Sequence, residues 1–234
     1  MPKQMLTLIL LFYSFFLYSN ETEELFFLMG KFEPQKHPEF VSLKSLGIPT
    51  KQKELFLQKD AALQLQKMYL AFRKEHPHIP FWITSATRSY WHQKTIWESK
   101  WQKNQNRSEE EKVKEILRFS SMPGASRHHW GTDVDVNVLE NSYYETQEGK
   151  ILFDWLKQNA KRFGFCMPYS ENRNQGHEVE KWHWSYFPLA KNYQKKWNEY
   201  FQKGAMQKHL DFSGSEYFPK YAAEYINSIN PECF

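Results

Sequence analysis

Cysteine, unbalanced charge and sequence repeats are all scarce in this chain. Its two cysteines, Cys166 and Cys233, are compatible with one disulfide in an exported protein or with two free thiols, because the sequence gives no distance between them. The net charge of +4 comes from 31 basic and 27 acidic residues, and so small and scattered an excess argues against a nucleic-acid binder. Without repeats or low-complexity tracts, the chain has the features of an ordinary globular protein.

Long apolar runs are also rare, and the clearest one lies at the N-terminus. Lys3 precedes an apolar run over residues 5–18, and a polar, acidic stretch over residues 20–24 follows it. This order is typical of a secretory signal peptide, and the run is shorter than the roughly 20 residues of a membrane-spanning helix. We expect residues 1–19 to be a signal peptide or an uncleaved N-terminal anchor, and the protein to be exported to the periplasm or cell envelope. No cysteine follows the run, so a lipoprotein anchor is not expected.

Periodic patterns in the rest of the chain predict an α+β fold. Hydrophobic residues make up 41% of the sequence, which is enough for a sizeable core. Apolar spacings of three and four residues predict helices, and alternation of apolar and polar residues predicts strands. The expected helices cover residues 59–76, 89–103, 150–163, 188–203 and 219–229, and the expected strands cover residues 81–85, 133–136 and 182–187. Together these elements form a small, mainly antiparallel sheet flanked by helices.

The segments outside this pattern are expected to be peripheral. Residues 20–57 carry three prolines and weak periodicity, which predicts an extended lead-in on the domain surface. Residues 58–203 form the domain itself, and residues 104–118 within it are an exposed helix or flap. Residues 204–234 form a C-terminal extension that packs on the domain.

Two short segments contain most of the residues that could carry chemistry. The first runs from Ser126 to Asp135, and the second, Glu-Lys-Trp-His-Trp-Ser-Tyr, covers residues 180–186. A catalytic zinc site uses three protein ligands from histidine, carboxylate or cysteine and leaves one position open. Two histidines and one aspartate from these segments supply such a set, and a nearby glutamate can take a proton from the attacking water.

The combined pattern Ser-x-His-(x)6-Asp followed by Glu-x-x-His resembles the VanY-like D-alanyl-D-alanine carboxypeptidases. These belong to a group of zinc peptidases that includes D,D-dipeptidases, lysostaphin-type endopeptidases and hedgehog domains. The resemblance covers about residues 60–190 and implies a hedgehog/D,D-peptidase-like fold. Carried over position by position, it implies that His128, Asp135 and His183 hold Zn²⁺ and that Glu180 is the general base.

A third match lies upstream, in the segment Ser-Ala-Thr-Arg-Ser-Tyr at residues 85–90. It resembles the family's Arg-Ser-Tyr segment, which implies that Arg88 stabilises the oxyanion of the tetrahedral intermediate or holds the substrate. A guanidinium suits this role because it donates parallel hydrogen bonds and stays charged. Gln93 and Ser126 match family positions near the terminal residue of the substrate, so both are candidates for substrate binding.

Several neighbouring residues compete for these roles. Asp133 lies two positions before Asp135 and shares its strand face, so the choice of Asp135 rests on the family spacing, and the family often has alanine at residue 133. His129 points away from His128 in an extended segment and is expected to pack or hydrogen-bond. His177 could cover the active site, contact substrate or have no role.

The leading interpretation is an exported zinc metallopeptidase that removes D-Ala from the end of peptidoglycan stem peptides. An L,D-carboxypeptidase or an L-Ala-D-Glu endopeptidase with the same site is the alternative within the enzyme class. A zinc-stabilised binding module, or a zinc-free structural protein of the envelope, is the alternative outside it, although a binding module would not need Glu180 or Arg88. No nucleic acid and no stable protein partner are implied, and we expect a monomer.

Overall fold

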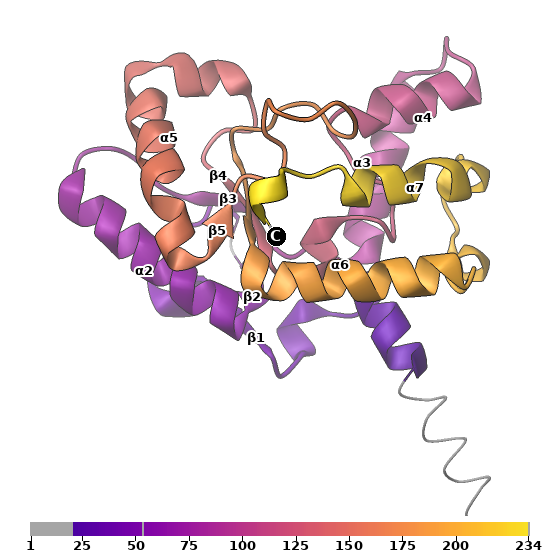
Figure 1. Cartoon of the computed structure of the whole chain (residues 1–234), viewed down its shortest axis with the longest axis horizontal. Coiled ribbons are helices and arrows are strands. Elements are labelled where there is room, and N and C mark those ends of the chain that lie inside the picture. The colour runs from indigo at the N-terminus through magenta and orange to yellow at the C-terminus, as the bar shows by residue number, and fades with distance from the viewer. Residues whose placement is uncertain (1–20, 53, 234) are drawn as a thin grey trace, which may run out of the picture.

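A four-stranded antiparallel sheet lies at the centre of the molecule (Figure 1). The computed structural model describes residues 21–52 and 54–233. The sheet has the strand order β3-β4-β6-β5. Its strands are β3 (Ile83–Ser85), β4 (Asp133–Val136), β5 (Phe165–Cys166) and β6 (His183–Tyr186). The predicted small antiparallel sheet is therefore confirmed.

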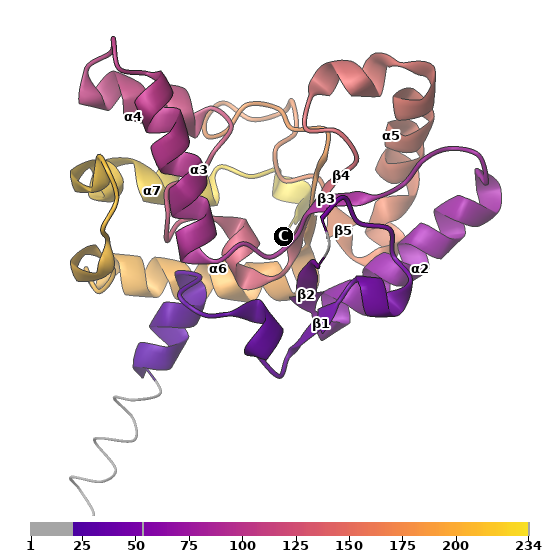
Figure 2. The same ribbon diagram turned by 180° about the vertical axis from the view of Figure 1, so that it is seen from behind.

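Helices flank this sheet on two sides, as the front and back views both show (Figures 1 and 2). On one side lie α2 (Lys59–Glu75) and α5 (Gln147–Asn159), which the short 3-10 helix η5 (Ala160–Phe163) extends. On the other side lie α3 (Tyr90–Lys103), α4 (Glu109–Leu117), α6 (Phe187–Gln202) and α7 (Phe218–Asn227). Apart from α4, these bounds agree closely with the helices expected from the sequence, and the α+β class is confirmed. Residues 104–118 were expected to be an exposed helix or flap, but α4 buries Val113, Ile116 and Leu117.

The two sides enclose separate hydrophobic cores. We call the first the sheet core; it takes its residues from ranges 43–86 and 134–184 and includes Phe72, Val134, Val136, Leu152 and Trp155. We call the second the helical core; it takes its residues from ranges 25–29, 90–130 and 190–226 and includes Leu28, Trp97, Trp130, Trp197 and Phe218. Because side chains alternate along a strand, β4 turns its valines into the sheet core and its aspartates to the opposite face.

The segment before α2 is not the extended surface lead-in that the sequence predicts. Residues 21–28 are helical, and Leu28 and Met29 are fully buried in the helical core. Strand β1 (Phe40–Ser42) then pairs with β2 (Phe56–Gln58) in a second, two-stranded sheet. The prolines mask the periodicity of this segment, and so does the shortness of its elements, since β1 and β2 have three residues each.

The N-terminal prediction falls largely outside the described residues. The expected signal peptide or anchor at residues 1–19 is not covered by the structure. Among the residues that the structure describes, no helix combines the length and apolar character needed to cross a membrane.

The C-terminal segment is fastened to the sheet side by a disulfide. Cys166 in β5 and Cys233 in the 3-10 helix η8 (Pro231–Cys233) are bonded, with their Cα atoms 5.6 Å apart. The Asn230 amide also donates to the carbonyl of Pro168 at 2.8 Å. Helix α7, which precedes this staple, packs its apolar side into the helical core. The tail therefore joins the two sides of the molecule.

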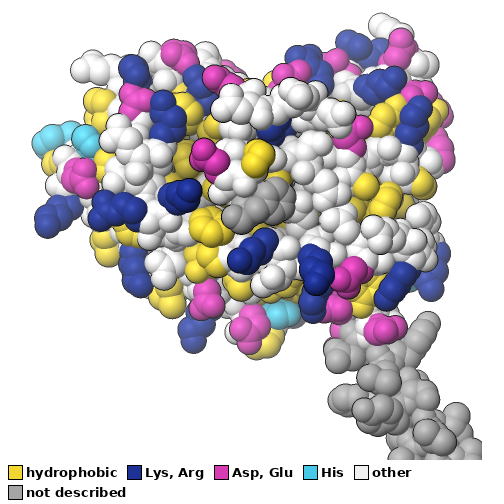
Figure 3. Space-filling view, viewed as in Figure 1, with side chains coloured by type: hydrophobic (Ala, Val, Ile, Leu, Met, Phe, Trp, Pro, Cys, Tyr) yellow, Lys and Arg dark blue, Asp and Glu magenta, His cyan; other side chains and the backbone are white. Residues whose placement is uncertain are grey.

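Charged side chains of both signs are interspersed over the face seen in Figure 3. No large area of that face is covered by lysine and arginine alone. This distribution agrees with the scattered charge of the sequence.

Candidate metal and catalytic centre

Antiparallel pairing of β4 and β6 brings two of the predicted metal ligands together. The register places Asp135 directly opposite His183. His128 comes from the 3-10 helix η3 (Arg127–Trp130), which ends at Gly131 just before β4. Gly131 has a φ of +70°, a conformation that glycine adopts without the steric cost of a side chain, and it turns the chain from η3 into the strand. The turn lets three residues from two segments meet on one face of the sheet.

His128, Asp135 and His183 form a buried group whose ligand atoms all lie within 4.8 Å of one another. Each histidine has one ring nitrogen fixed by a hydrogen bond: His128 Nδ1 lies 2.8 Å from the carbonyl of Ala86, and His183 Nε2 lies 2.8 Å from Asp133 Oδ2. The other nitrogens face Asp135 Oδ1, at 3.4 Å from His128 Nε2 and 3.1 Å from His183 Nδ1.

These inward-facing atoms fit a divalent metal. His128 Nε2 and Asp135 Oδ1 are buried atoms without a hydrogen-bond partner among the described residues. Buried polar atoms nearly always have a hydrogen-bond partner, so two partnerless atoms that face one point indicate a place where a cation binds. Two imidazole nitrogens and one carboxylate oxygen are the donor set of an open catalytic zinc site.

Asp133, which shares a strand face with Asp135, has no oxygen lone pair left to coordinate a metal, because its carboxylate already accepts four hydrogen bonds. Its Oδ1 accepts hydrogen bonds from Thr132 Oγ1 and Ser185 Oγ, both at 2.7 Å. Its Oδ2 accepts from His183 Nε2 and from Arg127 Nε at 3.2 Å. Asp133 therefore stands behind His183 and fixes its ring, the role that carboxylates commonly take beside metal-bound histidines.

The electrostatics of the group reflect the same arrangement. Burial alone would raise the pKa of Asp135, but His128, His183 and Arg88 outweigh it and hold that pKa well below its usual range. Burial also lowers the pKa of His128 to about 4, with a further contribution from Arg88. His128 is thus held neutral, the form in which imidazole binds a metal.

Glu180 lies beside the three donors. Its Oε2 is 3.5 Å from His183 Nδ1, and burial raises the pKa of its carboxyl group above the usual range. A carboxylate whose pKa is shifted toward neutral is better matched to taking and returning a proton. Glu180 therefore lies close to the three donors, and its role as the general base stays a prediction.

Arg88 approaches the group from the other side of the cavity. Its Nη2 contacts Asp135 Oδ2 at 3.1 Å, its Nη1 contacts Gln93 Oε1 at 2.9 Å, and its Nε donates to Ser85 Oγ at 3.0 Å. Three fixed contacts hold the guanidinium rigidly while leaving one N–H on each Nη free.

The two predicted substrate-binding residues, Gln93 and Ser126, are buried beside the site, and their roles toward substrate stay predictions. Gln93 is fully buried and joins Arg88 to the carbonyl of Ser121, so it positions the guanidinium. Ser126 is buried just before η3, where its carbonyl accepts the amide of His129. Neither side chain is among those that line the cavity.

Two other histidines near the site, His129 and His177, make structural hydrogen bonds. His129 links the carbonyl of Arg88, 2.7 Å from its Nδ1, to the amide of Gly124, which donates to its Nε2 at 3.1 Å. The hydrogen-bonding role expected for His129 agrees with these contacts. His177 lies 2.7 Å from the carbonyl of Leu117 and 3.0 Å from Ser121 Oγ, and so anchors the loop that precedes Glu180.

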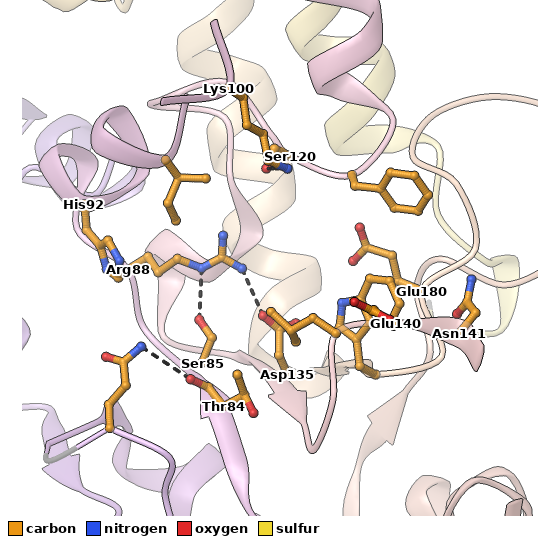
Figure 4. Close-up of a pocket in the computed structure, with 15 residues that line it drawn as sticks. Thr84, Ser85, Arg88, His92, Lys100, Ser120, Asp135, Glu140, Asn141 and Glu180 are labelled. Carbon is orange, nitrogen blue, oxygen red and sulfur yellow. Dashed lines mark hydrogen bonds and ion pairs between the residues drawn. The ribbon is translucent and has the colours of Figure 1, made fainter. Parts of the chain in front are cut away.

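A cavity of about 630 Å³ opens in front of the donors. Arg88, Asp135 and Glu180 point into the same space, and Lys100 enters it from α3 (Figure 4). The remaining lining residues come from β3, α3 and the loops around them: Gln52, Thr84, Ser85, His92, Ile96, Phe119, Ser120, Leu139, Glu140, Asn141 and Trp182. Of these, only Ser85 and Trp182 lie in the matched motifs, so Lys100 and the wall at residues 139–141 were not expected.

Comparison with known proteins agrees with this geometry. The family model for VanY, D-alanyl-D-alanine carboxypeptidase, matches residues 54–189. The chain belongs to this family. The matched range contains the three donors, Glu180 and Arg88, and the resemblance found in the sequence motifs is therefore confirmed.

Curated and solved relatives extend the comparison. "Putative carboxypeptidase YodJ" of Bacillus subtilis (strain 168) is 30% identical over 139 residues, which cover 56% of this chain and 46% of the relative. This chain thus spans about half the length of that protein. The solved LdcB LD-carboxypeptidase has a TM-score of 0.54 at 22% identity, covering 82% of this chain and 80% of its own. VanYB, solved with D-alanine-D-alanine, has a TM-score of 0.50 at 22% identity, covering 66% and 87%. These structures share the fold of this protein.

Proposed function

We propose that this protein is an exported zinc D-alanyl-D-alanine carboxypeptidase that removes the last D-Ala from peptidoglycan stem peptides. The observation that carries the proposal is the group of three inward-facing donors, which lies beside a buried carboxylate and opposite a rigid guanidinium. Membership of the VanY family supports the reaction class and the substrate class. The two orphaned buried atoms, His128 Nε2 and Asp135 Oδ1, support the metal.

His128, Asp135 and His183 would hold the zinc ion. When bound, zinc polarises the scissile carbonyl and makes the attacking water more acidic. Glu180 takes one proton from that water as its oxygen bonds to the carbonyl carbon. The bond from that carbon to nitrogen then breaks, and Glu180 returns the proton to the nitrogen of the departing D-Ala.

Arg88 acts on the carbonyl oxygen in this sequence. Negative charge develops on that oxygen as the tetrahedral intermediate forms, and the free N–H groups of Arg88 face the cavity where it would lie. The contacts from Ser85, Gln93 and Asp135 hold the guanidinium before substrate arrives, so little reorganisation is needed during the reaction. No conformational change of Arg88 is therefore required.

Export and a monomeric state are part of the proposal. The basic residue and apolar run at the N-terminus support export, and so does the Cys166–Cys233 disulfide, because disulfides persist in oxidising compartments. Fractionation of cells that express the full chain with a C-terminal tag tests this point. Recovery of the protein from the cytosol alone would contradict it.

The deciding experiment uses zinc-loaded protein and two defined stem peptides, with the products identified by mass. We expect a pentapeptide that ends in D-Ala-D-Ala to lose one D-Ala. Loss of the last residue of the tetrapeptide would instead indicate an L,D-carboxypeptidase, and cleavage after L-Ala would indicate an endopeptidase.

A pair of variants tests the mechanism in the same assay. Glu180→Gln should abolish turnover while the protein still binds one equivalent of zinc, as measured by elemental analysis. Glu171→Gln is the matched control, because Glu171 is an exposed carboxylate in the loop before the site. Near-normal turnover by Glu180→Gln would show that Glu180 is not the base, and zinc binding without turnover by the unaltered chain would favour a binding module.

A further inference from the structure

One face of α3 runs along the wall of the active-site cavity. His92, Ile96 and Lys100 follow Arg88 at intervals of four residues, and all four line the cavity. Arg88 lies just before α3, whereas His92, Ile96 and Lys100 lie within it; residues four apart in a helix share a face, so these three stack along the cavity wall. Lys100 lies farthest along this row from Arg88, and it projects toward the space between Arg88 and Glu180 (Figure 4). The cavity therefore has a second cationic side chain besides Arg88.

The charge of Lys100 has no counter-charge in direct contact. Its Nζ donates to Ser120 Oγ at 2.7 Å, and no carboxylate of the described residues lies within ion-pair distance of it. Burial lowers the pKa of Lys100, and attraction from Glu180 across the cavity opposes this shift. An ammonium group carries three N–H donors, so two remain for a ligand. A partly desolvated cation with free donors is a ready receptor for an anion.

Arg88, unlike Lys100, is in direct contact with a carboxylate. Its charge is already paired with Asp135, and its other contacts are fixed by Ser85 and Gln93. His92 adds no second cation, because burial and the neighbouring Arg88 lower its pKa. Of the basic side chains that line the cavity, Lys100 alone thus combines a full charge with the absence of a contacting carboxylate.

The substrate of a carboxypeptidase carries its own anion close to the bond that is cut. Only one residue separates the scissile carbonyl from the terminal carboxylate, and one residue spans about 3.8 Å. The anion must therefore lie near Arg88 and Glu180. Lys100 meets this condition, because it lines the same cavity as both residues and projects toward the space between them (Figure 4). Ile96 and Phe119 line the cavity nearby and offer apolar surface for the methyl group of an alanine.

We propose that Lys100, supported by Ser120, binds the free C-terminal carboxylate of the peptide and so restricts cleavage to the last residue. This inference rests on the proposed function, because it names the group that holds the substrate end in that reaction. It assigns carboxylate recognition to α3 and the loop after α4, whereas the sequence motifs pointed to Gln93 and Ser126. Both of those side chains are buried, and Gln93 accepts a hydrogen bond from Arg88.

The test compares one peptide in two forms, an acyl-D-Ala-D-Ala acid and its C-terminal amide. Lys100→Met keeps the length of the side chain and removes its charge. We expect it to raise KM for the acid about 10- to 100-fold, the usual effect of a lost hydrogen bond to a charged group, with kcat little changed. Hydrolysis of the amide should stay the same, so the preference for the acid disappears, and Lys100→Arg should restore part of it.

Lys103→Met is the matched control, because Lys103 is exposed on the same helix. It should keep the acid-to-amide ratio of the unaltered chain. An unchanged ratio in Lys100→Met, or an equal loss of activity on both peptides, would overturn the inference.

A binding measurement separates this inference from the proposed function. Zinc-loaded Glu180→Gln protein should bind the acid more tightly than the amide in calorimetry, and adding Lys100→Met should remove the difference. If the unaltered chain binds the acid through Lys100 but does not cut it, the proposed function fails and the carboxylate site stands. If the chain cuts the acid and the Lys100→Met ratio is unchanged, or if neither peptide binds, the carboxylate site fails.

Discussion

The sheet side and the helical side of this molecule are assembled in different ways. The sheet core takes its residues from two nearly continuous stretches, 43–86 and 134–184, whereas the helical core gathers residues from three stretches that include both ends of the described chain. The family match at residues 54–189 covers most of the first but only the middle of the second. The two outer stretches of the helical core, residues 25–29 and 190–226, therefore lie outside the range that the family model matches.

The active site lies on the seam between them. Asp135 and His183 come from the central sheet, while Lys100 comes from a helix of the other side. If the proposals above hold, the sheet side supplies metal ligands for the reaction and the helical side supplies the group that selects the peptide end. Variants on each side measure how far the two sides are independent.

The largest effect should come from the metal-binding face of the sheet side. Asp135→Ala removes a donor, and we expect zinc affinity to fall at least about 1,000-fold, with activity falling alongside, because a lost ligand removes several kcal/mol of binding. Asp133→Asn should weaken zinc only about 10- to 100-fold, the usual effect of altering a residue behind a ligand. Competition with a metal-sensitive dye measures both. The reverse order would make Asp133 the ligand.

A large cavity in the helical core should destabilise the protein without touching the metal. Trp197 is fully buried there, and Trp197→Ala should lower the free energy of unfolding by about 3–5 kcal/mol. Trp91→Ala is the control; Trp91 is 52% exposed, so its loss should cost less than about 0.5 kcal/mol. Urea unfolding and zinc titration test the two sides together. A loss of zinc affinity in folded Trp197→Ala would show that the sides are coupled.

The disulfide that joins the tail to the sheet side should have a smaller effect. It closes a loop across a sequence separation of 67 residues, so reduction should lower stability by about 2–5 kcal/mol. The melting temperature, measured with and without reductant, shows the change. The Cys166→Ser, Cys233→Ser double variant should melt at the reduced value whether or not reductant is present. A melting temperature that reductant leaves unchanged would argue against a stabilising bond.

At neutral pH the smallest effect should come from His177, which joins α4 to the loop before Glu180, because its contribution is lost only as the pH falls. Burial lowers the pKa of His177 to about 3, below the unfolded value of about 6.5. Between these values the unfolded state binds more protons, so stability is full above pH 6.5 and declines toward pH 3 by up to about 1.4 kcal/mol per pH unit. His177→Gln should make urea midpoints less steep with pH over this range. An unaltered slope would exclude His177 as a source.

The predictability of the fold follows the same division. Helices α2 and α5 and strands β4 and β6 have clear apolar periods, and their positions agree with the sequence prediction. The helix at residues 21–28 and the β1–β2 pair were missed, because these elements are too short for a clear period and Leu25 and Leu28 pack into the helical core with residues far along the chain. Local patterns cannot report such partners.

The site was predictable where a motif fixed both residue type and spacing. The three donors and Glu180 meet as expected, but sequence could not decide between Asp133 and Asp135, since both face the same side of β4. The pairing with β6 shows that Asp135 lies opposite His183 among the metal-facing atoms, whereas Asp133 hydrogen-bonds the far side of the His183 ring. Lys100 was missed because a lysine on a helix is usually solvated, and only the cavity distinguishes it.

The contact between Phe40 and Gly131 has a practical meaning for anyone who would shorten this protein. The ring of Phe40 occupies the space beside Gly131, where an added Cβ atom would come within 2.3 Å of it, and so it covers the turn that carries His128. Phe40 lies outside residues 54–189, the range that the VanY family model matches. A fragment trimmed to residues 54–189 would expose that turn, along with the part of the helical core that the two chain ends cover. The range that the family model matches is therefore smaller than the set of residues that packs around the turn carrying His128.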